Sequence, residues 1–106
     1  MTTTAARSRD YLRKQGYIAA VVEHRSGKFR FDLFGIGDTI ALPVPLHPKG
    51  ILLVQAYLNT KRNREKHAMF DLSHPMVLRW RAVGGRFEHH RWYKKKGRWN
   101  VNIIEI

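Results

Sequence analysis

Two short apolar runs, joined by a proline-rich loop, limit the possible folds of this chain more than any other feature. The first run, residues 38–42, begins with Asp38, and the second, residues 51–56, is apolar except for Gln55 near its end. Apolar runs of this length, bounded by Pro and Gly, are typical of buried β-strands. The intervening loop is too short for a helical crossover, so we expect the two strands to be antiparallel neighbours in one sheet.

The N-terminal segment predicts a helix followed by another buried strand. The threonines at 2–4 supply caps for a helix over residues 4–15, and Gly16 stands where helices commonly end. Residues 17–23 are almost continuously apolar, which favours a strand buried on both faces. A Ser-Gly-Lys turn at 26–28 follows this strand.

The C-terminal half predicts two helices and a hairpin. Thr60 caps a strongly basic helix over residues 60–69, and a second helix starts with Ser73 as its cap. Residues 86–93 and 98–106 predict two strands joined by a cationic turn. We expect the basic helical region to return the chain across the sheet, so that the segment after it adds a further strand.

Composition and element order together predict the class of protein. We expect one α/β domain over residues 1–106, with a mixed central sheet, helices on both of its faces and a C-terminal β-hairpin. No apolar run approaches the roughly 20 residues that span a bilayer. The chain has no cysteine, which fits a reducing compartment. We therefore expect a soluble, cytoplasmic protein.

The strongest bulk signal is charge, since 20 Lys and Arg face 8 Asp and Glu and leave a net charge of +12. A domain this basic attracts polyanions, of which phosphate backbones are the commonest. The candidate phosphate-binding residues lie in the basic helix and in the hairpin turn: Lys61, Arg62, Arg64, Lys94, Lys95, Lys96 and Arg98. Alternatively these are solvated charges of a basic structural or ribosome-associated protein.

Aromatic residues flank the cationic turn of the predicted hairpin. Trp92 and Trp99 lie on either side of it. They are suited to stacking on bases, or they form a cross-strand pair that covers a small core. His89 and His90 are neighbours in a strand and point to opposite faces, so they do not share a metal ion.

Acidic side chains are scarce, yet several stand at the ends of predicted strands. Glu23 ends the first strand, Asp32 and Asp38 precede the second, and Gln55 lies near the end of the third. Mg²⁺ prefers hard oxygen ligands and, with a nearby lysine, it assists phosphodiester hydrolysis. The plain alternatives are that Asp38 caps a turn, that Asp32 pairs with a neighbouring arginine, and that Glu23 does the same.

The αβββαβ order carries a specific resemblance. The sequence Gly-Asp-Thr-Ile-Ala at 37–41 leads the second strand, and Leu-Leu-Val-Gln-Ala-Tyr at 52–57 forms the third. This arrangement resembles the PD-(D/E)xK superfamily, which has the restriction-endonuclease-like fold. It is most similar to the small VRR-NUC and archaeal Holliday junction resolvase-type nucleases. The resemblance covers about residues 5–70.

The resemblance implies a metal-dependent endonuclease that acts on DNA, including branched or Holliday-junction DNA, as a homodimer with Mg²⁺ or Mn²⁺. Asp38 matches the metal-binding Asp, and Ala56 would offer its carbonyl oxygen. Gln55 stands where the family has Glu or Asp, and Tyr57 where it has Lys. The implied site is completed by Lys66 as a lysine that has moved to the following helix, and by Glu23 or Asp32 as the missing acid.

A second hypothesis follows from these departures. Gln55 brings no charge to a metal ion, and Tyr57 does not replace an ammonium group. The same scaffold would then bind nucleic acid without cleaving it.

Overall fold

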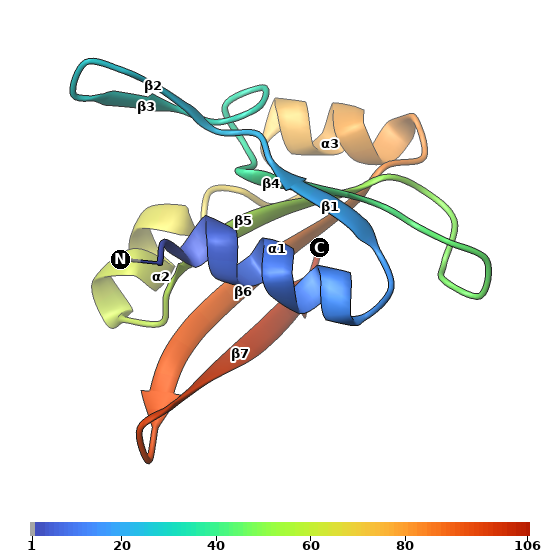
Figure 1. The fold of residues 1–106 in the computed structure, drawn as a ribbon. Helices are drawn as coiled ribbons and strands as arrows, with labels where there is room; N and C mark the ends of the chain where they lie inside the picture. Colours follow the sequence, from blue (N-terminus) through green and yellow to red (C-terminus); the bar gives the residue numbers. More distant parts are fainter. Residues whose placement is uncertain (1) are drawn as a thin grey trace.

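A computed structural model describes residues 2–106 of the protein as one α/β unit with a mixed five-stranded sheet (Figure 1). The elements follow in the order α1 (Thr4–Lys14), β1 (Ile18–Val21), β2 (His24–Ser26), β3 (Phe29–Phe31), β4 (Thr39–Leu42), β5 (Leu52–Leu58), α2 (Lys61–His67), α3 (Pro75–Ala82), β6 (Arg86–Lys95) and β7 (Arg98–Glu105). The predicted α/β class, with its mixed sheet and C-terminal hairpin, is confirmed.

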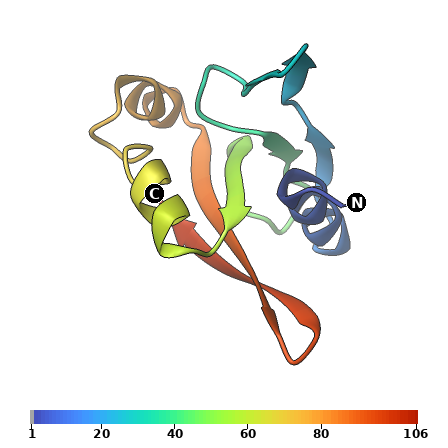
Figure 2. The same cartoon turned by 90° about the vertical axis from the view of Figure 1, so that its left-hand side faces the viewer.

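The strand order of the large sheet is β1-β4-β5-β6-β7. β1, β4 and β5 are antiparallel neighbours, as predicted, with Ala20 opposite Ile40 and Ile40 opposite Leu53. β6 then pairs with β5 in parallel, because α2 and α3 return the chain to the starting edge. β7 folds back on β6 in a long antiparallel hairpin whose end projects beyond the rest of the sheet (Figure 2).

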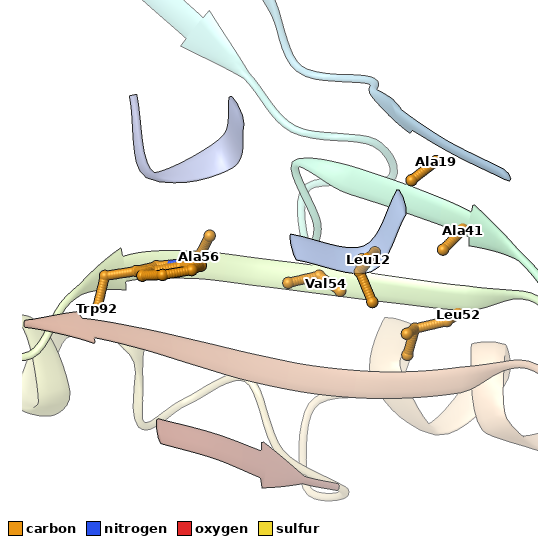
Figure 3. Close-up of a cluster of buried hydrophobic side chains, with 7 residues drawn as sticks. All are labelled: Leu12, Ala19, Ala41, Leu52, Val54, Ala56 and Trp92. Atoms are coloured by element: carbon orange, nitrogen blue, oxygen red, sulfur yellow. The ribbon is translucent and has the colours of Figure 1, made fainter. Parts of the chain in front are cut away.

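Helices cover both faces of the sheet, so two apolar clusters form. Figure 2 shows α1 on one side and α2 and α3 on the other. On the α1 side, Leu12 packs over the small side chains of the central strands and Trp92 closes one end (Figure 3). On the α3 side, Val77 packs with Leu53 and Phe87. Each such side chain contributes roughly 1.5–3 kcal/mol on burial.

Alternation along β5 sends its side chains to these two clusters. Val54 and Ala56 face α1, whereas Leu53 packs in the cluster beneath α3. Gln55 shares the face of Leu53 because side chains alternate with a period of two. All residues of β5 except Leu58 are buried, so the prediction of a two-sided strand is right for this segment.

Other predictions require correction. Strand β1 lies at the edge of the sheet and its first residue, Ile18, is exposed, so it is not buried on both faces. An edge strand has a covering layer only where a helix reaches it. Thr60 caps α2 as predicted, but His74 rather than Ser73 caps α3, because the Ser73 hydroxyl and amide turn back to Asp71.

The turn at 26–28 is confirmed, but the hairpin built on it was not predicted. β2 and β3 form a separate two-stranded sheet that projects from the body (Figure 1). All of its residues are exposed, and each strand has only three residues, so the Phe-Arg-Phe alternation of β3 is too short to predict a strand. It brings Arg30 toward the polar end of β5, as described below.

The tryptophans do not form a directly opposed pair. Trp92 lies opposite Val101, and Trp99 lies opposite Lys94. The strand register, which the turn length sets, places the two rings on a diagonal. His89 and His90 do point to opposite faces, since His89 bonds the Phe70 carbonyl and His90 bonds Ser8 of α1.

Candidate metal and nucleic-acid site

Asp38 is a buried carboxyl at the point where β4 begins. Its Oδ2 accepts a hydrogen bond from the Ala56 backbone N–H at 2.9 Å, and its Oδ1 accepts one from the Thr39 hydroxyl at 2.9 Å. Gly37 allows this approach, because a Cβ there would lie 2.3 Å from the Leu53 side chain. The Asp38 backbone N–H donates to the Val54 carbonyl at 2.8 Å, and its side chain extends the pairing of β4 with β5 as far as Ala56.

Burial raises the pKa of Asp38 to about 7. The two hydrogen bonds act in the opposite direction, since they favour the ionised form. The negative charges of Asp32 and Glu23 raise the pKa further, so both lie near enough to be felt. Asp38 therefore changes its protonation state close to neutral pH.

Gln55 is joined directly to Asp32. Its side-chain N–H donates to Asp32 Oδ2 at 3.0 Å and to the Ile36 carbonyl at 2.9 Å. The Gln55 Oε1 and Asp32 Oδ1 atoms are both buried, and neither has a hydrogen-bond partner among residues 2–106. Two bare oxygens in adjacent side chains are a donor set for a cation or a water molecule.

Glu23 and Asp32 do not pair as the simplest alternatives propose. Glu23 forms an ion pair with Arg30 at 3.3 Å, not with Arg25, although the contact lacks hydrogen-bond geometry. Asp32 binds Gln55 rather than Arg30. The β2–β3 hairpin explains the Glu23–Arg30 pair, because the reversal of the chain brings Arg30 back to Glu23, which lies between β1 and β2. The acidic residues thus lie near one another and not in separate turns.

A cavity of about 420 Å³ opens beside these groups. Its walls include Asp32, Gln55, Arg30, Lys66 and His67. Lys66 of α2 therefore lines the same cavity as Asp32 and Gln55, whose two unpaired oxygens are themselves buried. A smaller cavity of about 220 Å³ shares Arg30, Lys66 and His67 and extends along α2 to Asn63 and to Thr4 of α1.

Tyr57 is buried in a network of its own. Its hydroxyl lies 2.6 Å from His89 Nδ1 and accepts from Arg91 Nε at 3.0 Å. His89 Nε2 lies 2.7 Å from the Phe70 carbonyl oxygen, so Nε2 carries the proton and Nδ1 accepts from Tyr57. The Tyr57 ring also stacks on His67 at 4.2 Å. Tyr57 thus anchors β6 and α2 to β5, and it lines the smaller cavity rather than the one beside Asp32 and Gln55.

In the sequence, His67 belongs to the basic segment at 61–67, which is predicted to follow a phosphate backbone beside the metal. Burial, followed by the charge of Lys66, lowers its pKa to about 4, so it is a neutral imidazole at pH 7. From its place at the end of a basic helix, His67 would be expected to face solvent. Only the stacking on Tyr57 and the cavity wall distinguish it.

The residues beside the 420 Å³ cavity offer oxygen atoms to a divalent cation, but they do not form a complete set of metal ligands. Among residues 2–106, no three His, Asp or Glu side chains are grouped so as to hold a metal ion by themselves. The Ala56 carbonyl, the predicted backbone ligand, accepts a hydrogen bond from the Thr4 hydroxyl at 3.2 Å. Asp32 Oδ1 and Gln55 Oε1 are oxygen donors of the kind that Mg²⁺ prefers, and both are buried.

The predicted phosphate-binding residues fall into two groups. Lys61, Arg62 and Arg64 lie on α2, where Arg64 is partly engaged with the Asn59 side chain at 2.8 Å. Lys94, Lys95, Lys96 and Arg98 lie at the end of the β6–β7 hairpin, which projects away from β4 (Figure 1). The two groups therefore do not line one cavity.

Neither a family model, nor a curated protein, nor a solved structure matches this chain. In the part of the chain that the structure describes, no helix is long and apolar enough to cross a membrane.

Proposed function

We propose that the protein is a divalent-metal-dependent nuclease acting on DNA. The observation that supports this most is a pair of buried oxygens, Asp32 Oδ1 and Gln55 Oε1, that lack a hydrogen-bond partner within residues 2–106. Both belong to residues that line the same cavity as Lys66. Asp38, whose pKa is raised to about 7, and Glu23 lie within electrostatic reach. This is the set of groups that the resemblance to PD-(D/E)xK nucleases implies, with Asp32 supplying the charge that Gln55 lacks.

Each residue has a defined role in this proposal. Asp32, Gln55 and ionised Asp38 hold the metal ion, and Glu23 adds negative charge. A bound Mg²⁺ or Mn²⁺ supplies Lewis-acid activation of the phosphate and a more acidic water. Lys66 places its ammonium beside the phosphate, where negative charge grows as the phosphodiester is cleaved.

The basic surface supports nucleic acid as the partner. Arg30 and Lys66 flank the cavity, and Lys61 and Arg62 extend the positive charge along α2. We propose DNA, branched DNA included, as the substrate. We also propose a homodimer, because a 12.5 kDa chain has little surface with which to hold two duplex arms.

A cleavage assay tests this function. Purified protein is incubated with linear duplex, single-stranded and four-way-junction DNA in Mg²⁺, Mn²⁺ or EDTA. We expect cation-dependent cleavage that is lost in Asp38→Asn and Asp32→Asn. The matched control is Glu105→Gln, which removes an exposed carboxylate at the end of β7. Cleavage that persists in both aspartate variants would contradict the proposal.

A second candidate function is DNA binding without cleavage. Both oxygens of Asp38 already accept hydrogen bonds, and buried Tyr57 occupies the position of the usual lysine. This alternative predicts salt-sensitive binding that EDTA and Asp38→Asn leave unchanged. It also predicts no cleavage of any of the three DNA forms by the wild-type protein.

A further inference from the structure

A separate cavity of about 560 Å³ lies on the α1 face, between α1 and the β6–β7 hairpin. Its walls include Arg7, Tyr11 and Lys14 of α1, together with Trp92 and Trp99 of the hairpin. It therefore combines aromatic rings and cationic side chains. None of these residues lines the cavity beside Asp32 and Gln55.

The two tryptophans of this cavity differ in their surroundings. Trp92 is 6% exposed, belongs to the α1-side core and donates its indole N–H to Ser8 at 2.9 Å. Trp99 is 37% exposed and belongs to neither buried cluster. Burial in the core thus explains Trp92 but not Trp99.

Cations surround the Trp99 ring. The guanidinium carbon of Arg7 lies 3.8 Å from the ring centroid, and the Lys94 ammonium lies 5.3 Å from it. The Arg7 guanidinium lies over the ring face, so a nucleobase that stacks there takes the place of the guanidinium, which then meets the phosphates together with Lys94. A base in a duplex is already stacked on both sides, so only an unpaired base has a free face to offer.

We propose that this cavity binds an unpaired nucleobase, stacked on Trp99, with Arg7, Lys14 and Lys94 contacting the flanking phosphates. The required elements come together only in the fold, because Arg7 and Trp99 are far apart in the sequence. The single acidic residue in the cavity wall, Asp10, is paired with Arg9 at 2.9 Å, which reduces its repulsion of phosphate.

The position of the cavity connects it with the proposed nuclease site. The small cavity that shares Lys66 and His67 with that site reaches Thr4, and the Trp99 cavity begins at Thr2. A strand that leaves the Asp32–Gln55 cavity along the start of α1 therefore arrives at Trp99. This deepens the proposed function by specifying DNA with an unpaired segment, but binding at Trp99 does not depend on cleavage.

Fluorescence anisotropy in EDTA tests the site without any contribution from cleavage. The probe is a labelled single-stranded oligodeoxynucleotide of about 15 nucleotides, with a hairpin duplex of equal charge for comparison. We expect Trp99→Ala to weaken single-strand binding about 5- to 100-fold and to leave duplex binding nearly unchanged. The salt dependence of binding stays the same, because no phosphate contact is lost. Arg7→Gln should instead lower the salt slope by about one.

Two further variants make the result interpretable. Trp99→Leu keeps apolar volume and removes only the aromatic face, so it replaces the alanine variant if that variant unfolds. Phe34→Ala removes another exposed aromatic ring, near α3, and should leave single-strand affinity unchanged. The proposal is overturned if a folded Trp99→Leu protein binds the single strand within about two-fold of wild type, or if duplex binding falls equally. Neither outcome bears on whether Asp38 supports cleavage.

Discussion

The side-chain amide of Gln55 donates a 3.0 Å hydrogen bond to Oδ2 of Asp32, which lies 23 residues earlier in the chain. The amide also donates to the Ile36 carbonyl, so both of its protons are used. A glutamate at this position would set its carboxylate against another carboxylate and a carbonyl oxygen. The amide at 55 and the acid at 32 therefore form one unit, in which Asp32 provides the charge.

This relationship predicts the behaviour of Gln55→Glu. Without metal, we expect a loss of about 2–4 kcal/mol of stability, since two buried donors are replaced by a charge facing Asp32. Added Mg²⁺ or Mn²⁺ should stabilise the variant more than the wild type, because the new carboxylate binds the cation. Urea unfolding with and without metal measures both effects. Equal stability of the two proteins in EDTA would show that the Gln55–Asp32 contact has no energetic weight.

Asp38 predicts a pH dependence of stability. Its pKa is about 7 when folded and near its usual 3.8 when unfolded. From about pH 4 to 7 the folded state therefore holds the extra proton, and stability falls as the pH rises through this window. Asp38→Asn should match wild type near pH 4 and exceed it by about 2–4 kcal/mol at pH 8. Urea unfolding at several pH values measures the difference.

The control for Asp38 is a carboxyl whose pKa is shifted in the opposite direction. Asp71 is exposed, and hydrogen bonds from Ser73 lower its pKa. Asp71→Asn should therefore lose stability relative to wild type above pH 4, not gain it. If a cation binds at Asp38, added Mg²⁺ should also flatten the pH dependence of the wild type, since metal and proton compete.

Lys66 and Lys61 should separate catalysis from binding. Lys66 lines the cavity and Lys61 does not, although both lie on α2. Lys66→Gln is expected to lower the cleavage rate at saturating DNA by about 100-fold. Lys61→Gln should weaken binding a few-fold, lower the salt slope by about one and leave that rate unchanged. Single-turnover kinetics and a salt titration distinguish the two; equal rate losses would remove Lys66 from the proposed mechanism.

Tyr57 should act through stability and not through chemistry. Tyr57→Phe leaves Arg91 Nε and His89 Nδ1 without their shared partner, at a cost of about 1–3 kcal/mol. Tyr93→Phe is the matched control, since Tyr93 is partly exposed and belongs to neither apolar cluster. Thermal unfolding of both variants tests this. A Tyr57→Phe protein of unchanged stability that no longer cleaves DNA would assign the hydroxyl a catalytic role instead.

Gly37 tests how closely β4 and its loop pack on β5. A Cβ at 37 would lie 2.3–2.9 Å from three Leu53 side-chain atoms, so Gly37→Ala should cost about 1–3 kcal/mol. Combining it with Leu53→Ala should cost less than the sum of the two single changes, because the new methyl enters the space that leucine leaves. A double-mutant cycle by urea unfolding measures this, and strict additivity would show that the two residues do not compete for space.

Local pattern in the sequence was sufficient for most of the secondary structure. Apolar runs between proline and glycine predict β4 and β5, the Thr60 cap predicts α2, and the cationic turn predicts the β6–β7 hairpin. The sequence also shows that Asp38 and Gln55 are polar residues within apolar strands. These features depend on neighbours a few residues apart, so they can be read along the chain.

Only the tertiary structure decided which distant residues meet. The strands of the exposed β2–β3 hairpin are too short for their apolar pattern to predict them, yet the hairpin brings Arg30 to Glu23 and leaves Asp32 against Gln55. Sheet order made β1 an edge strand, and the register of β6 with β7 placed Trp99 beneath Arg7. Such contacts depend on chain reversal, strand register and burial, which are properties of the whole fold and not of any local segment.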